Sequence, residues 1–308
     1  MLSIFGNAVL PVFAVVVMGY AFGWLKLFGK SEASTINKTV FYVFLPALLF
    51  KLVAQASFDK FEPLYVLGYL GAELVVYLLT IWLSYGIFKR CMRESLLLGM
   101  AAAYCNHTFF ILPIAEVLYG QDALLPVTAV IVIDNLLILG GTVLALELMG
   151  KNGTGSTFQN FCATFYTNPN MIALALGLVV SLSGFSIDNG IGFYAGFVGS
   201  AAAPASLFAL GLVLNGQPFK LAEPLVVSVT ALKLLVVPAI GWVLFEMVFA
   251  LPDYWVGPGM LVAAGPSGVL AFVIGVQYGV PEKLLSQVIL VTTFFSVVTV
   301  TAVAALTA

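Results

Sequence analysis

Apolar runs, each long enough to cross a membrane as a helix, constrain this sequence more than any other feature. About 20 apolar residues in a helix span the ~30 Å hydrocarbon core of a bilayer. Short stretches with charged residues, Gly, Pro or Asn separate the runs. The pattern predicts an all-α membrane protein with ten transmembrane helices. The runs fall at about residues 3–25, 36–57, 63–88, 95–119, 123–148, 168–184, 190–214, 222–248, 256–279 and 283–307.

Composition excludes several classes of protein. Hydrophobic residues make up 62% of the chain and charged residues 8%, against roughly 45–50% and about 25% in soluble domains. The net charge of -2 is too small to suggest nucleic acid as a partner. The three cysteines are too widely spaced for a metal site or a disulfide framework. We therefore expect the lipid bilayer as the surroundings of the chain, with no bound metal and no nucleic acid.

Lysine and arginine positions predict how the chain is oriented. Cytoplasmic loops of membrane proteins carry an excess of these residues. With both termini outside the cytoplasm, nine of the twelve fall on the cytoplasmic side, Lys60 falls outside, and Lys51 and Lys233 lie within apolar runs. We therefore expect a multi-pass protein with both termini extracytoplasmic. The nine are Lys26, Lys30, Lys38, Lys89, Arg90, Arg93, Lys151, Lys220 and Lys283.

The two halves of the sequence resemble each other at an offset of 158 to 161 residues. Four matches in the same order indicate a duplication of five helices, with repeats at 1–150 and 160–308. Because five is odd, the second copy must enter the membrane upside down, which is the inverted-repeat architecture of secondary transporters. The matched stretches are "PVFAVVVMG" with "PNMIALALG", "PALLF" with "PASLF", "FDKFEPL" with "FKLAEPL", and "LYG" with "QYG".

Helix-breaking residues lie in the middle of the fourth run, "NHTFFILPI", and of its repeat partner in the ninth, "GPSGVLAFV". Such breaks persist in a membrane only where they line a polar cavity or are buried in protein. We expect the two broken helices to face each other, and their half-helix N-termini to bind the carboxylate of a substrate. The opposing interpretation is a simple kink at Pro113 and a structural His107. The candidate substrate residues here are Asn106, His107, Thr108, Pro113, Pro266, Ser267 and Gly268.

Ionisable residues inside the apolar runs form a second group of candidates, because an ion in the bilayer centre must be paired, hydrated or neutral. Glu73 and Lys233 lie at nearly equivalent depths in the two repeats, so either they pair or Lys233 contacts the substrate or another acid. Asp134, followed by Asn135, lies deep in the fifth run. Either Asp134 carries a coupling proton or cation, or the substrate is not a simple anion; a buried Asp without a transport role is the other alternative.

These stretches together resemble the auxin efflux carrier family, within the larger group of bile-acid, arsenite and riboflavin transporters. The resemblance implies an elevator-type carrier of organic anions such as indole acetate or malonate. Helices one, two, six and seven would form a scaffold that dimerises through helices two and seven, and helices three to five and eight to ten a moving transport domain. Asn106 and Pro113 match the crossover Asn and Pro of the family. The resemblance is carried by "FYVFLPALLF", "NHTFFILPI", "NPNMIALALGLVVSL", "LKLLVVP" and "GPSGVLAFVIGVQYG".

Two departures from the plant members of this family matter. The plant proteins carry a proline where this chain has Ala271, with Pro266 upstream, so the crossing point in the ninth helix stays open. Their long cytoplasmic loop is reduced to residues 151–167, so regulation by kinases should not be carried over.

The function expected from the sequence is transport of a small mono- or dicarboxylate by alternating access. No HExxH, no GxSxG with a partner histidine and no metal cluster occurs, so we expect no catalytic residues and no enzyme activity. No cofactor is expected beyond a coupling proton or sodium ion. The alternatives are a sodium-coupled symporter like the bile-acid branch and a passive channel.

Overall fold

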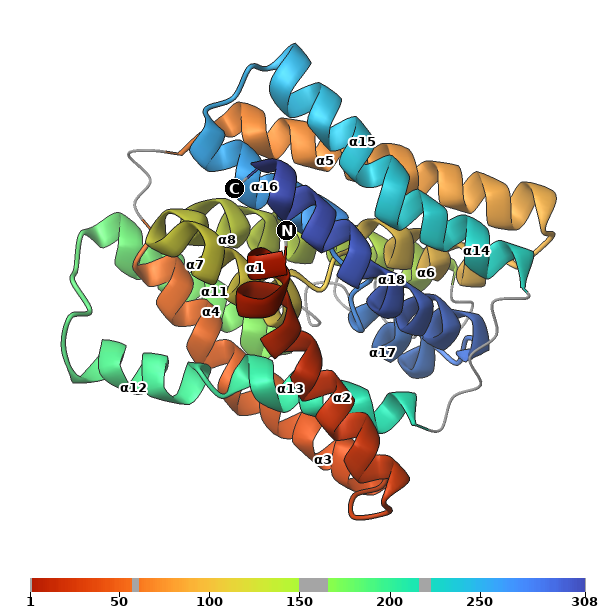
Figure 1. Cartoon of the computed structure of the whole chain (residues 1–308), viewed down its shortest axis with the longest axis horizontal. Helices are drawn as coiled ribbons and strands as arrows, with labels where there is room; N and C mark the ends of the chain where they lie inside the picture. The colour runs from red at the N-terminus through yellow and green to blue at the C-terminus, as the bar shows by residue number, and fades with distance from the viewer. Residues whose placement is uncertain (1, 57–60, 150–165, 216–222, 308) are drawn as a thin grey trace. The chain divides into compact units, whose positions relative to one another are not determined.

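The structure is a computed structural model that describes residues 2–56, 61–149, 166–215 and 223–307. The regular elements in these ranges are all helices, as Figure 1 shows. Seven helical stretches among the described residues are long and apolar enough to cross a membrane. This confirms the expected class of an all-α membrane protein. The stretches are Phe5–Trp24, Lys30–Ala54, Pro63–Ile87, His107–Met149, Gly190–Leu214, Pro224–Val248 and Lys283–Thr307.

The difference between these seven stretches and the ten expected runs has local causes. The fourth run is divided between α6 (Met92–Ala103) and the helix that resumes at His107. The ninth run is divided between α16 (Asp253–Ala264) and α17 (Leu270–Gln277). The sixth run forms α11 (Pro169–Ser183), which has only 15 residues. The count of ten crossings and the inverted repeat stay predictions.

The chain forms two compact units, each of which takes segments from both halves of the sequence. Unit 1 comprises Met1–Val9, Glu62–Thr157 and Gln217–Ala308, and unit 2 comprises Leu10–Phe61 and Phe158–Gly216. The expected repeats, 1–150 and 160–308, and the roles of scaffold and transport domain stay predictions. Lys60, Lys151, Lys220 and most of the short loop at 151–167 lie outside the described residues.

Unit 2 is held together by close contacts between helices at glycines. A methyl group on Gly19 of α2 would collide with the carbonyl of Phe208 in α13, and one on Gly211 of α13 would collide with the carbonyl of Val16. Small residues allow such backbone approach where lipid gives helices no hydrophobic reason to associate. The helices of unit 2 are α2 (Leu10–Trp24), α3 (Lys30–Thr39), η2 (Val40–Phe44), α4 (Leu45–Ala54), α11, α12 (Gly190–Gly199) and α13 (Ala202–Leu214).

Unit 1 has an aromatic core that joins α5 (Pro63–Ile81) to η9 (Val243–Val248) and to α16, the first half of the broken ninth run. The ring of Tyr65 lies 4.7 Å from that of Trp255 and 5.3 Å from that of Phe245. The helices of unit 1 are α1 (Leu2–Ile4), η1 (Phe5–Val9), α5, η4 (Trp82–Ile87), α6, η5 (His107–Ile111), α7 (Leu112–Tyr119), η6 (Gly120–Ala123), α8 (Leu124–Ile133), η7 (Asp134–Leu139), α9 (Gly140–Met149), α14 (Pro224–Ala231), η8 (Leu232–Val236), α15 (Val237–Trp242), η9, α16, α17 and α18 (Lys283–Thr307).

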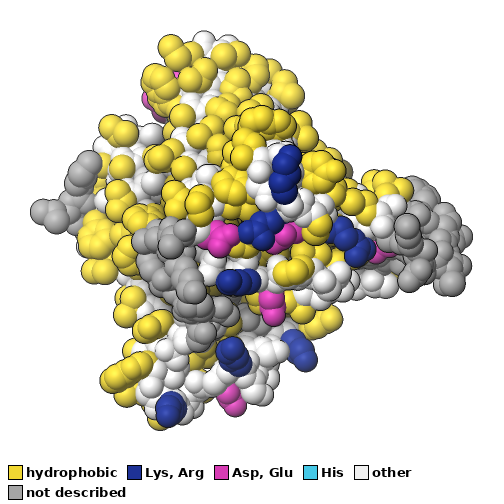
Figure 2. All heavy atoms as spheres, turned by 90° about the vertical axis from the view of Figure 1, so that its right-hand side faces the viewer, with side chains coloured by type: hydrophobic (Ala, Val, Ile, Leu, Met, Phe, Trp, Pro, Cys, Tyr) yellow, Lys and Arg dark blue, Asp and Glu magenta, His cyan; other side chains and the backbone are white. Residues whose placement is uncertain are grey.

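Exposed apolar side chains show which solvent the molecule is suited to. Leu78 and Trp82, on consecutive turns of unit 1, are among many large apolar side chains that stay exposed. The face drawn in Figure 2 carries broad areas of hydrophobic side chains, with Lys and Arg gathered near Asp and Glu. Arg90 and Glu223 form an ion pair at 2.7 Å. Exposed apolar area of this extent fits contact with lipid rather than water.

Candidate functional site

Two helix breaks in unit 1 lie against each other. The helix α6 ends at Ala103, and the helical path resumes at His107 after an extended Tyr104. In the second break α16 ends at Ala264 and α17 begins at Leu270. Cys105 and Ser267 form an antiparallel bridge between the two segments. The breaks therefore pair as a minimal β-ladder inside a helical protein.

Main-chain hydrogen bonds hold the two breaks together. The N–H of Asn106 donates to the carbonyl of Pro266 at 2.9 Å, and the N–H of Gly268 donates to the carbonyl of Tyr104 at 2.9 Å. Unpaired backbone groups cost several kcal/mol each in an apolar interior. Each break thus satisfies polar groups that the other break frees.

Side chains satisfy further carbonyls at the ends of the first half-helices. In α6 the carbonyl of Ala101 accepts from Ser267 Oγ at 2.6 Å, and that of Ala103 accepts from Lys233 Nζ at 2.7 Å. In α16 the carbonyl of Ala264 accepts from Thr299 Oγ1 at 2.9 Å. A cation at a helix C-terminus is also favoured by the helix dipole. Lys233 therefore caps the first broken helix.

Glycine is required where the breaks cross. A methyl group on Gly265 would lie 2.6 Å from Cys105 Sγ, and one on Gly268 would lie 2.5 Å from a ring carbon of Tyr104. Real Cβ atoms do not approach other heavy atoms so closely. The two glycines of the Gly-Pro-Ser-Gly sequence are therefore required by these close contacts as well as by the helix break.

The second half of each broken helix directs its N-terminus toward the crossing. The first N–H groups of a helix have no intrahelical partner and carry positive partial charge. After the first break the carbonyl of Asn106 accepts from the N–H groups of Phe110 and Ile111, at 3.1 and 3.3 Å, which opens the helical path at His107. After the second break α17 begins four residues past Pro266. Both second half-helices thus begin beside the crossing.

Buried ionisable side chains lie beside the first break. His107 Nε2 is 3.2 Å from Asp134 Oδ2, and His107 Nδ1 is 3.1 Å from Thr108 Oγ1. The carboxyl group of Glu73, on α5, is a close neighbour of that of Asp134. Exposure of the side chains is 2% for His107 and 0% for both acids. We name Glu73, His107 and Asp134 the acid–histidine cluster.

Lys233 neighbours this cluster without a direct contact to Glu73. The expected alternatives were a pair with Glu73 or proximity to another acid or to the substrate. The Nζ atom instead donates to the carbonyl of Ala103, and no ion pair joins Lys233 to Glu73. Lys233 is fully buried and still acts electrostatically on Glu73. The hydrogen bond to the carbonyl of Ala103 holds the ammonium group of Lys233 at the end of α6, one residue before the break.

Asn135 and Tyr104 connect the fifth run to the crossing. Asn135 Nδ2 donates to the carbonyl of Ile131 at 2.7 Å, and the hydroxyl of Tyr104 lies 3.4 Å from Asn135 Oδ1. The Tyr104 ring centre lies 5.0 Å from that of His107. The sequence reasoning missed Tyr104, Thr299 and also Thr292, whose Oγ1 accepts from the N–H of Ser267 at 3.2 Å. Tyr104 stands two residues before the "NHT" motif.

The two prolines of the candidate site have different positions. Pro266 lies within the second break, so the crossing falls upstream of Ala271, which is part of α17. Pro113 lies within α7, seven residues beyond Asn106. The first helix therefore breaks at Tyr104 to Asn106 rather than at its proline.

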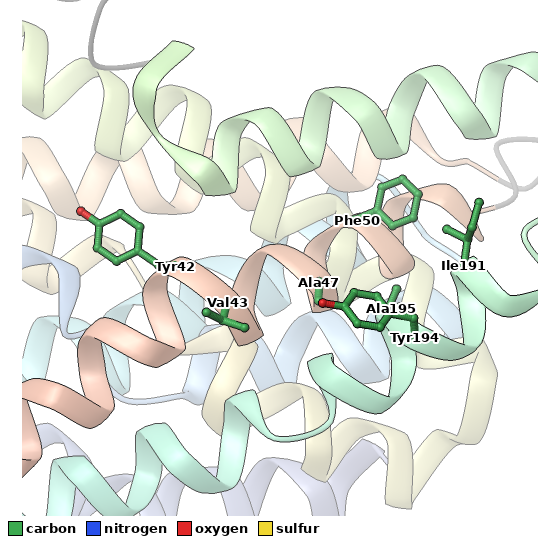
Figure 3. A pocket seen from close by; sticks show the side chains of 7 residues that line it. All are labelled: Tyr42, Val43, Ala47, Phe50, Ile191, Tyr194 and Ala195. Atoms are coloured by element: carbon green, nitrogen blue, oxygen red, sulfur yellow. The ribbon is translucent and has the colours of Figure 1, made fainter.

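A hollow in unit 2 is lined by none of the residues predicted for the site. Its volume is about 370 Å³, and Figure 3 shows its lining side chains between η2–α4 and α12. The lining is apolar and aromatic, with two tyrosines as its hydroxyl-bearing members. It is lined by Tyr42, Val43, Ala47, Phe50, Ile191, Tyr194 and Ala195.

Apolar helices around a pair of helix breaks define an integral membrane protein. The chain belongs to the family described as "Membrane transport protein", whose family model matches residues 4–304. This confirms the resemblance to the auxin efflux carrier family. The chain is therefore a multi-pass transporter of the membrane.

Individual relatives match over most of the chain. A "Putative malonate transporter" of Rhizobium meliloti (strain 1021) is 26% identical over 296 residues, which cover 95% of this chain and 92% of the relative. An "Uncharacterized transporter" of Methanothermobacter thermautotrophicus is 28% identical over 302 residues and 95% of both chains. The "Uncharacterized transporter YfdV" of Escherichia coli (strain K12) is 23% identical over 243 residues and 77% of both chains.

Proposed function

We propose that this protein is a secondary transporter that moves a small mono- or dicarboxylate across the membrane by alternating access. The substrate is held at the crossing of the two helix breaks. The observation that carries this proposal is the pairing of the breaks by the two main-chain hydrogen bonds of Asn106 and Gly268. Broken helices of this kind bind ions and substrates in secondary transporters.

The chemistry of the crossing favours a carboxylate. Two helix starts supply N–H donors and positive partial charge. Asn106 and Thr108, both largely buried, add an amide and a hydroxyl beside the first of them. A relative named for malonate matches 95% of the chain, which supports a small carboxylate as the substrate class.

The acids near the crossing must be balanced for an anion to bind. Glu73 and Asp134 together carry two negative charges when ionised, and Lys233 carries one positive charge. His107 lies against Asp134 and can supply a second positive charge when it is protonated. The crossing then presents no net negative charge to the substrate.

The finer mechanism follows from the same proposal. Residues of the third to fifth and eighth to tenth expected helices would move as an elevator, with the crossing as cargo site. The remaining helices would form a scaffold that dimerises through the second and seventh, 36–57 and 190–214. Both termini would face the extracytoplasmic side, so that the basic loops lie in the cytoplasm.

The test is transport by purified protein in liposomes, recorded as current on a solid-supported membrane and as uptake of labelled malonate. Small mono- and dicarboxylates are titrated at two pH values, with and without sodium. We expect a saturable flux for at least one of them. Asn106→Ala should weaken its apparent affinity by about tenfold or more, because a buried hydrogen bond to a charged group is lost.

The matched control is Asn37→Ala, at an exposed position on α3, which should leave the apparent affinity unchanged. A flux that never saturates would indicate a channel, and loss of flux on replacement of sodium by potassium would indicate a sodium symporter. Absence of flux for every carboxylate tested would contradict the proposed substrate class.

A further inference from the structure

The charges of the acid–histidine cluster and of Lys233 do not cancel when both acids are ionised and His107 is neutral. Two carboxyl groups and one ammonium group are fully buried, and the imidazole of His107 is almost so. With both acids ionised and the imidazole neutral, the cluster and Lys233 together carry one net negative charge. A single added proton makes the group neutral. Buried net charge is unfavourable, so the cluster favours the state with one proton added.

The acceptors of this cluster are also unsatisfied. None of the four carboxyl oxygens of Glu73 and Asp134 has a hydrogen bond of good geometry from any described residue. Buried polar atoms in native proteins nearly always have a partner. The carboxyl groups of Glu73 and Asp134 are close neighbours, and His107 Nε2 lies close to Asp134. A proton is the partner that fits between these groups.

The groups that face the cluster do not provide this proton. Lys233 is held by the carbonyl of Ala103, and Cys105 is part of the bridge between the breaks. The hydroxyl groups of Tyr65, Tyr69 and Tyr104 also face the cluster and are neutral donors. The proton that can come and go therefore belongs to Glu73, His107 and Asp134.

We propose that the acid–histidine cluster carries one exchangeable proton in each transport cycle, so that carboxylate and proton cross the membrane together. This inference rests on the proposed function. The proton binds the cluster on the side where the substrate enters and returns to water where the substrate leaves. A monocarboxylate then crosses without net charge, and a dicarboxylate dianion crosses with one net negative charge.

A metal cation fits the cluster less well than a proton. Sodium and similar hard cations require several oxygen ligands, whereas the cluster includes an imidazole nitrogen and neighbours an ammonium group. In the part of the chain that the structure describes, no three acid, histidine or cysteine side chains are grouped to hold a metal ion.

The experiment uses the intact protein in liposomes that contain a pH-sensitive dye, with the membrane potential clamped by potassium and valinomycin. Malonate and monocarboxylates are added outside, and protein-free liposomes correct for diffusion of the free acid. We expect the lumen to acidify as labelled substrate enters. For a monocarboxylate, an inward gradient of one pH unit should support about tenfold accumulation, because proton activity changes tenfold.

Two variants assign the proton to the cluster. In Asp134→Asn and in Glu73→Gln, we expect the residual flux to be the same with and without the pH gradient, a ratio of about one. Asp253→Asn and Glu116→Gln, at exposed positions of unit 1, are the matched controls and should keep it. An infrared band of the bound proton, either the carbonyl band of a protonated carboxyl group or a ring band of protonated imidazole, should be present in the wild type and lost in at least one cluster variant, whatever the rate of transport.

The outcomes separate this inference from the proposed function. Saturable carboxylate flux that moves no protons and ignores the pH gradient would overturn the inference and leave the carrier in place. Wild-type stimulation in both cluster variants would also overturn it. If no carboxylate is transported, the proposed function fails, and absence of the infrared band would then remove the shared proton as well.

Discussion

At the scale of single residues, Lys233 shows how a buried charge acquires a structural use. Its position within an apolar run predicts a pair with an acid, since an isolated ammonium group is costly in a membrane. The structure gives its Nζ atom a helix-end carbonyl as direct partner, and the acids of the cluster remain neighbours at longer range. One side chain thereby ends a helix and offsets part of the negative charge nearby.

Removing this cap should destabilise unit 1. In Lys233→Met the carbonyl of Ala103 loses its donor and the acids lose their nearest fixed positive charge. We expect a loss of about 1–3 kcal/mol from the unsatisfied carbonyl alone, measured as a lower midpoint of thermal unfolding in detergent by tryptophan fluorescence. Lys283→Met, exposed at the start of α18, is the control. Equal midpoints for the two variants would show that the cap contributes nothing.

At the scale of elements, π-helical turns precede prolines in four helices. The segments η1, η2, η5 and η8 each end two residues before a proline, at Pro11, Pro46, Pro113 and Pro238. A proline lacks the N–H that would close an ordinary turn and its ring needs room against that turn. A widened turn provides the room, and π-helical turns are frequent at functional sites. His107 and Lys233 both lie in such segments.

The crossing of the two broken helices depends on close contact at glycine. Gly268→Ala would drive a methyl group into the Tyr104 ring and separate the main-chain pair that joins the breaks. Overpacking of this kind costs about 1–3 kcal/mol, so we expect a lower unfolding midpoint and a large loss of substrate flux.

Gly141→Ala serves as the control for this crossing, because a methyl group there meets nothing within 4 Å. It should unfold at or above the wild-type midpoint, since alanine favours a helix more than glycine does. Wild-type flux and stability in Gly268→Ala would contradict the tight crossing.

These elements show what the sequence can and cannot predict. Apolar length predicts the helices, and Gly, Pro and Asn predict that the fourth and ninth runs break, because both signals are local. The partner of His107 depends on Asp134, 27 positions later in the chain, and on the rotation of η7, which no local pattern encodes. The sequence also did not predict that the first helix breaks at Tyr104, because Pro113 is a stronger helix-breaking signal than Tyr104.

At the scale of the whole molecule, the distribution of lysine and arginine predicts which side of the membrane each loop faces. Cys91 is an exposed free cysteine in the loop before α6, among Lys89, Arg90 and Arg93. A membrane-impermeant maleimide should therefore label it in inside-out vesicles and not in intact cells.

Two comparisons make that labelling specific. The variants are made in a Cys162→Ser background, because Cys162 lies outside the described residues; the signal should then disappear in Cys91→Ser, because Cys105 is buried in the crossing. Labelling of Cys91 in intact cells would reverse the predicted orientation and place both termini in the cytoplasm.

The main-chain character of the crossing has a consequence for how such transporters diversify. The two hydrogen bonds that join the breaks use only N–H and carbonyl groups, so they require a glycine at Gly268 but no particular side chain at Asn106. Side chains at Asn106, Thr108 and Asn135 can then change in evolution while the joint is inherited intact. One scaffold can in this way give rise to carriers with different cargoes through a few substitutions.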